Sequence, residues 1–282
     1  MKKKFNQFVC LTITMLAFVS CSSDDDPANT ASVKVISAQV EKGNSYNSMI
    51  DSVYVELDWE NREDWGSEII ARSAYRNGGF TLALPGEIDD SFLYPINEED
   101  EADEMFQNAT ISDKSARLAA FMGVSAYKEG SLVGSFERSN VDPFAAEDME
   151  ASEILSLLSR GIYSIIYMYA DRPVTVKGSY TEQDSELEDG FFGEVKGNVN
   201  VSLLKGWNVV AIKMVVNMNI AQQKVTTTVT MTTSEPSGLK WYFYNYSDNF
   251  ELALPPSALR SSSKLTQTFG TKFFHRFKFH NP

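Results

Sequence analysis

The chain has 282 residues and a formal net charge of −13, with two histidines and two cysteines. We do not expect so acidic a chain to bind nucleic acid, because Lys and Arg side chains must neutralise the phosphates. Both histidines, His275 and His280, fall in the last eight residues, which argues against Ser-His-Asp catalysis or a histidine zinc site in a packed body. We therefore expect no bound metal and no cofactor.

The N-terminal segment has the pattern of an export signal. Three lysines at residues 2–4 precede an apolar run over residues 8–19, which is too short to cross a bilayer comfortably. The run ends just before Cys21, and an acidic stretch follows it. The other cysteine, Cys10, lies inside the apolar run, so cleavage of the signal would leave no pair of thiols for a disulfide.

Residues 18–21, Phe-Val-Ser-Cys, resemble a bacterial lipobox, in which a signal peptidase cuts before a cysteine that carries diacylglycerol. The Ser-Asp-Asp-Asp sequence at residues 23–26 resembles the export tag of Bacteroidota-type surface lipoproteins. The resemblance implies a signal peptide over residues 1–20, a lipidated Cys21 and a flexible tether that ends at residue 32. It also implies that the lipid bilayer is a partner, and that the body faces the cell surface of the outer membrane or, alternatively, the periplasm.

Beyond the tether, apolar residues recur with a period of two, which indicates half-buried strands. In residues 52–59, Val, Val, Leu and Trp alternate with Tyr, Glu and Asp, and a turn at residues 77–79 precedes a second alternating segment. We predict a small β-sandwich module over residues 33–86. The two segments resemble the transthyretin-like or carboxypeptidase-regulatory-like β-sandwich, whose later element is of the Gly-x-Phe-x-Leu kind, here Gly79–Leu82. That resemblance implies a non-catalytic structural or binding module.

Residues 87–113 are predicted to form an acidic linker or loop. No Lys or Arg lies between Arg76 and Lys114, and the sequence NEEDEADE occupies residues 97–104. Clustered carboxylates can bind calcium, but this run lacks the alternating spacing and the central glycine of a calcium loop. A solvated loop is the simpler interpretation.

Residues 114–246 are predicted to form a larger antiparallel β domain with a helix near residues 143–160. Asp142 and Pro143 are helix start signals, an apolar stripe follows, and Gly161 ends the helix, whose first residue the sequence leaves open between 143 and 151. The candidate strands after the helix span residues 162–170, 174–180, 191–203, 207–220, 225–233 and 239–246.

Alternate positions from Val210 to Ile220 are apolar while the opposite face is largely polar, and sheets with one solvated face are antiparallel. We therefore predict a mainly all-β fold of antiparallel β-sandwich modules with one interrupting amphipathic helix. The pattern does not distinguish a sandwich from a barrel over residues 114–246.

Two rows of tyrosines are the candidate ligand-binding residues. If Trp241 and Phe243 point inward, the tyrosines beside them lie on the outer face of the last strand. Planar side chains on an exposed sheet can stack on sugar rings or contact a partner protein, whereas ordinary strand packing is the alternative. The candidates are Tyr242, Tyr244 and Tyr246 in the last strand and Tyr163, Tyr167 and Tyr169 in the strand that follows the helix.

A glycoside hydrolase would need only two suitably separated carboxylates. The candidates are Asp58 with Glu60, and Glu186, Glu188 and Asp189; each set is also explained by a solvated strand face or loop. The basic aromatic tail, residues 247–282, could form a final strand or contact an anionic surface.

The expected function is that of a non-enzymatic, membrane-anchored binding or structural lipoprotein. One alternative is a carbohydrate-capturing accessory lipoprotein that uses exposed tyrosine rows, and a surface protein is a second kind of partner for the same rows. Less favoured alternatives are a carboxylate-dependent glycoside hydrolase and a lipocalin-like carrier, in which residues 162–246 would close around an apolar cavity.

Overall fold

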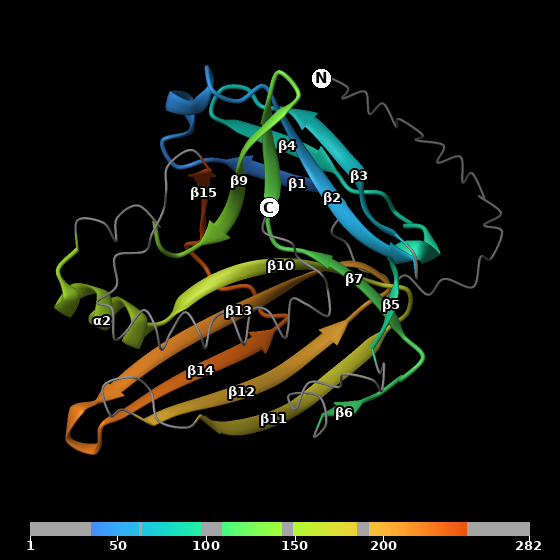
Figure 1. Ribbon diagram of the computed structural model, residues 1–282. Coiled ribbons are helices and arrows are strands. Elements are labelled where there is room, and N and C mark those ends of the chain that lie inside the picture. Colours follow the sequence, from blue (N-terminus) through green and yellow to red (C-terminus); the bar gives the residue numbers. More distant parts are fainter. Residues whose placement is uncertain (1–34, 62–63, 97–108, 143–148, 185–191, 247–282) are drawn as a thin grey trace, which may run out of the picture.

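The computed structural model describes residues 35–61, 64–96, 109–142, 149–184 and 192–246 (Figure 1). These residues form many strands and one α-helix, α2 (Ala151–Arg160), so the predicted all-β fold is confirmed. The predicted signal, Cys21, the acidic run and the basic tail lie outside the described residues.

Thirteen strands form one bent sheet with two halves, which meet where Ser139 of β9 pairs with Ser164 of β10. The first half contains, in order, β3 (Asp64–Ala74), β2 (Ser52–Asn61), β8 (Val124–Lys128), β9 (Ser131–Ser139) and β15 (Lys240–Asn245). The second half contains β5 (Tyr94–Pro95), β7 (Arg117–Phe121), β10 (Ile162–Ala170), β13 (Gly206–Asn219), β14 (Lys224–Thr232), β12 (Phe192–Leu203), β11 (Val174–Asp184) and β6 (Thr110–Ile111). A separate pair, β1 (Val35–Gln39) and β4 (Gly79–Ala83), packs on the first half.

The strand pairs are antiparallel, as predicted, with one exception among the described ladders. β12 and β14 are parallel, because β14 is inserted between β12 and β13, two strands that follow each other along the chain. Asn208, which is buried, holds the turn between β12 and β13: its side-chain amide donates to the carbonyl oxygens of Leu204 and Gly206, both at 2.8 Å. Its Oδ1 accepts a hydrogen bond from the Leu204 N–H at 2.9 Å, so both the donor and the acceptor of this buried side chain have hydrogen-bond partners.

Strands from both predicted modules share a sheet and a hydrophobic core. β2, from the first predicted module, pairs with β8 of the second, and β15 forms a bridge to Val40 just after β1. The main core combines Ile36, Val53 and Phe80 with residues as distant in sequence as Trp241. The predicted linker at residues 87–113 therefore does not separate two cores.

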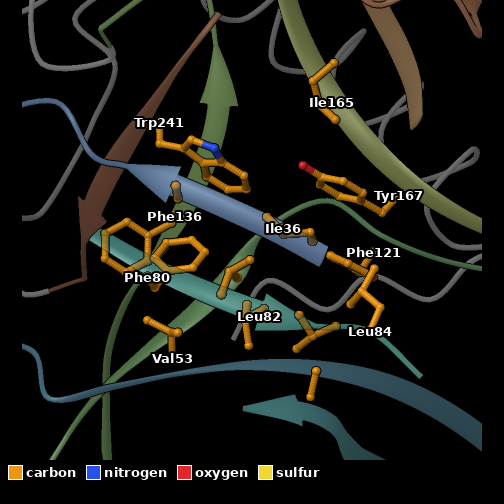
Figure 2. Packing of buried hydrophobic residues seen from close by; sticks show 14 of the residues in the cluster. Ile36, Val53, Phe80, Leu82, Leu84, Phe121, Phe136, Ile165, Tyr167 and Trp241 are labelled. Carbon is orange, nitrogen blue, oxygen red and sulfur yellow. The ribbon is translucent and has the colours of Figure 1, made fainter. Parts of the chain in front are cut away.

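The main core is rich in aromatic rings (Figure 2). The Phe136 ring, which is fully buried, lies 5.1 to 5.3 Å from the ring centroids of Tyr75, Phe80 and Phe243. Phe80 also contacts Trp241 edge to face, with ring centroids 5.4 Å apart. Such ring pairs stabilise the fold beyond the burial of apolar surface area. This cluster therefore stabilises the packing of β4, β9 and β15 against one another.

A second core lies on the other face of β10 and its neighbouring strands. It contains Leu118, Ile166, Val201 and Val210, with Ile96 packed from the segment after β5. The lipocalin-like alternative required residues 162–246 to close around a cavity. Instead, the described strands form an open sheet, and the apolar side chains on this face pack into a core.

Helix α2 covers the far end of the same sheet. Ile154 and Leu158 pack against Val216 of β13 and Val225 of β14. The helix begins within the predicted range, but Asp142 does not cap it: Glu150 is the N-cap residue and forms a reciprocal capping box with Glu153. Gly161 ends the helix with a positive φ of 102°, as the sequence predicted.

Candidate functional site

The tyrosines of β15, and Tyr246 directly after it, have the predicted orientation but differ in exposure. Trp241 and Phe243 point into the main core, which places Tyr242, Tyr244 and Tyr246 on the opposite face. Tyr246 is 44% exposed and Tyr244 is half-buried, whereas Tyr242 is only 8% exposed. The prediction of an exposed row is therefore wrong for Tyr242.

The tyrosine row of β10 does not form an exposed surface. Tyr167 and Tyr169 are buried in the main core, where Tyr167 stacks on Phe121 at a centroid distance of 5.0 Å. The prediction of an outer row is wrong for these two residues, because β10 is buried on both faces. Tyr163 lies outside this core. The ammonium group of Lys213 lies over its ring, 5.4 Å from the ring centroid, in a cation–π contact.

Tyrosines and carboxylates gather on the outer face of the first half of the sheet. Four strands contribute one continuous row, in which Tyr54 of β2 lies opposite Ser125 of β8, Ser125 opposite Ser135 of β9, and Ser135 opposite Tyr244 of β15. Three strand spacings, about 14 Å, separate the two tyrosine backbones. We call this surface the tyrosine–glutamate face; its residues are Tyr54, Glu56, Ser125, Tyr127, Ser135, Glu137, Tyr244 and Tyr246.

Glu56 is held by hydroxyl groups of the neighbouring strand. Tyr127 donates to Glu56 Oε1 at 2.9 Å, and Ser125 donates to Glu56 Oε2 at 3.1 Å. The Tyr127 ring packs on the Tyr54 ring with a centroid distance of 4.5 Å. Burial, reinforced by the hydrogen bond to Glu56, raises the pKa of Tyr127 to about 12, so its hydroxyl is a hydrogen-bond donor at every physiological pH.

Glu137 approaches the same strand from the other side. Glu137 lies beside Gly123, because a Cβ atom at that glycine would be 3.7 Å from the Glu137 Cγ. Since glycine has no side chain, no side chain of β8 stands between β2 and β9 at this position. Burial raises the pKa of Glu137 to about 7. A carboxyl group with this pKa changes charge near neutral pH, whereas an ordinary glutamate is ionised there.

Tyr246 interacts electrostatically with both carboxylates. Burial is the main cause of its raised pKa, and the negative charges of both Glu137 and Glu56 contribute, while a hydrogen bond with the Ser135 side chain opposes them. Glu137 also raises the pKa of Tyr244, after burial. Each glutamate therefore interacts electrostatically with tyrosines around it, and Tyr246 interacts with both.

The outer face of the second half of the sheet has a different chemistry. Thr226, Thr228, Thr230 and Thr232 of β14 line it, with asparagines and lysines of the neighbouring strands. Its carboxylate, Glu194, lies 3.0 Å from both Lys196 and Lys224, which neutralise it and lower its pKa. The described residues of this surface offer hydrogen bonds but no packed ring pair such as that of Tyr54 and Tyr127.

Of the carboxylates predicted from sequence, only Asp58 has a described side chain. Asp58 is half-buried on β2, two residues from Glu56, whereas the Glu60 side chain and the set Glu186, Glu188 and Asp189 lie outside the described parts. The described residues contain no cluster of three His, Cys, Asp or Glu side chains suited to a metal. No α-helix within the described ranges is long and apolar enough to cross a membrane.

No protein-family model matches the chain, and comparisons with curated proteins and with solved structures found no similar protein. Sequence reasoning placed Glu56 and Tyr54 on the outward face of their strand but did not single them out. It missed Glu137 and Tyr127, because only the pairing of β8 with both β2 and β9 brings these residues together.

Proposed function

We propose that this protein is a membrane-anchored, non-enzymatic binding protein that captures carbohydrate on the tyrosine–glutamate face. The observation that supports the proposal is the row Tyr54, Ser125, Ser135 and Tyr244, in which two rings flank two hydroxyl groups across four strands. Rings can stack on the apolar faces of sugars, while serine hydroxyls and glutamate oxygens hydrogen-bond the sugar hydroxyls. An open sheet surface suits an extended chain of sugars.

The experiment is a glycan array probed with the full-length protein, followed by calorimetry of the oligosaccharides that bind. Tyr54→Ala with Tyr127→Ala removes the packed ring pair, and we expect affinity to fall about tenfold or more, which corresponds to ~1.4 kcal/mol or more. Tyr163→Ala is the matched control, because it removes a half-buried tyrosine from a different sheet surface. If the wild-type protein bound no saccharide, a structural or protein-binding role would replace this proposal.

The membrane anchor rests on Cys21 and the residues before it. Acyl chains contribute about 0.8 kcal/mol for each buried methylene, so two or three chains retain a protein on a bilayer. We expect Cys21→Ser to move the protein from the membrane fraction to the soluble fraction and to abolish acylation, as measured by fractionation and mass spectrometry. A Cys21→Ser protein that stays acylated and membrane-bound would contradict the lipobox assignment.

A further inference from the structure

The two glutamates of the tyrosine–glutamate face reach the same strand from opposite sides. Glu56 of β2 is bonded to Ser125 of β8, and Glu137 of β9 lies beside Gly123, just before that strand. β2 and β9 are the two neighbours of β8, so their backbones are about 10 Å apart. A ligand group placed over Gly123 would have a carboxylate on each side.

The two glutamates differ from Glu194 in their charged neighbours. Among the described residues no Lys or Arg forms an ion pair with Glu56 or Glu137, whereas Glu194 on the other sheet surface has two lysines at 3.0 Å. Arg72 of β3 lies opposite Tyr54 on the same face and is exposed, but it forms no ion pair with either glutamate, and Lys240 pairs with Glu41 at 3.0 Å. The described part of this face therefore presents two carboxylates that are not ion-paired.

The rings favour the same sign of charge. The face of a tyrosine ring is electronegative and attracts ammonium groups. Tyr54 and Tyr127 form a packed pair beside Glu56, and Tyr246, which is 44% exposed, interacts electrostatically with both glutamates. Carboxylates and π faces together form a site that is complementary to a cation.

We propose that the saccharide captured by this face carries a positively charged amino group, which binds over Gly123 between Glu56 and Glu137. This inference rests on the proposed function and adds the chemical class of the ligand, an amino sugar with a free ammonium group. The sugar rings stack on the tyrosine rings. The side chains of Ser125, Ser135 and Tyr246 form hydrogen bonds with the hydroxyl groups of the sugar. A neutral sugar leaves the two carboxylates without a counter-charge.

The protonation of Glu137 gives this inference a measurable signature. Since its pKa is about 7, Glu137 is mostly neutral at pH 6 and mostly ionised at pH 8. A ligand whose positive charge does not titrate is therefore expected to bind about tenfold more tightly at pH 8 than at pH 6. Tyr244 of β15 and Tyr246 just after it interact electrostatically with Glu137. The ionisable groups that interact with these two tyrosines are Glu56 of β2, Tyr127 of β8, Tyr242 of β15 and Asp142, whereas Arg138, next to Glu137 on β9, pairs with Glu235 and interacts with Tyr167.

Two matched probes test the inference in calorimetry with the full-length protein. One is an oligomer of N-trimethylglucosamine, whose charge is permanent, and the other is the N-acetylated oligomer of the same length, which is neutral. We expect the charged oligomer to bind more tightly, and Glu56→Gln or Glu137→Gln to weaken it about 10- to 100-fold at pH 8. Glu137→Gln should also abolish the difference between pH 6 and pH 8.

Glu87→Gln is the control, because it removes one negative charge from an exposed position outside the face. Equal affinity for the two oligomers, unchanged by Glu56→Gln and Glu137→Gln, would overturn the inference while leaving carbohydrate capture intact. Failure of both oligomers and of every glycan on the array would overturn the proposed function as well. Neutral oligomers that bind more tightly than the charged one would also contradict the inference.

Discussion

Phe136→Ala is expected to lower the free energy of unfolding by about 3 to 5 kcal/mol and to destabilise the whole body in one transition. The Phe136 side chain is fully buried, and its ring contacts Tyr75, Phe80 and Phe243, which come from both predicted modules. Removal of the ring leaves a cavity that the surrounding aromatic rings cannot fill without losing their own contacts. The measurement is urea unfolding followed by tryptophan fluorescence and by circular dichroism.

The matched control for this variant is Leu132→Ala on the same strand. Leu132 is 37% exposed, so its truncation should cost no more than about 1 kcal/mol. Trp207 and Trp241 both lie in the main core and report on its loss. Two separate unfolding transitions, only one of which moved in Phe136→Ala, would mean that the predicted modules fold independently despite their shared core.

Hydrophobic periodicity predicted the strands well because it depends only on local spacing. Val53, Val55 and Leu57 alternate into the core as expected, and the strand predicted at residues 162–170 has the observed bounds of β10. The turns were also predictable: Asn77 and Gly78 both have positive φ, as do Glu129 and Gly130, which is typical of two-residue hairpins. The two-residue period of apolar side chains predicts which residues of a strand share a face. It carries no information on which other strand pairs with that strand.

The errors concern strands with two buried faces and residues brought together by pairing. Tyr167 and Tyr169 were expected on an outer face, yet Ile166 and Met168 between them are also apolar, and a run that is apolar on both faces is typical of a strand buried on both sides. That signal was present in the sequence. The pairing of Glu56 with Glu137 across β8 had no local signal, because the register of β8 with its two neighbours is set by long-range packing.

The second large effect is expected at Glu137. Its pKa is raised from 4.5 to about 7 by burial, so the folded protein holds this proton over a pH range in which the unfolded chain has lost it. Its contribution to stability is therefore full below pH 4.5, is lost progressively as the pH rises to 7, and does not change further above that. Glu137→Gln keeps the size of the side chain and removes the cost of ionising a carboxyl group at this half-buried position. We expect this variant to be about 2 to 3 kcal/mol more stable than the wild type at pH 8 and equal to it at pH 4.

Chemical denaturation at a series of pH values measures this difference directly. Glu87→Gln, at an exposed position, controls for the loss of one negative charge from an acidic protein and should give no such pH-dependent gain. A constant stability difference across the pH range, or a less stable Glu137→Gln protein at pH 8, would show that burial does not penalise the Glu137 carboxylate. A gain confined to high pH would mean that the protein retains a carboxylate at a cost to its stability. Such a cost is typical of a residue kept for binding, and a cation bound over Gly123 would offset it.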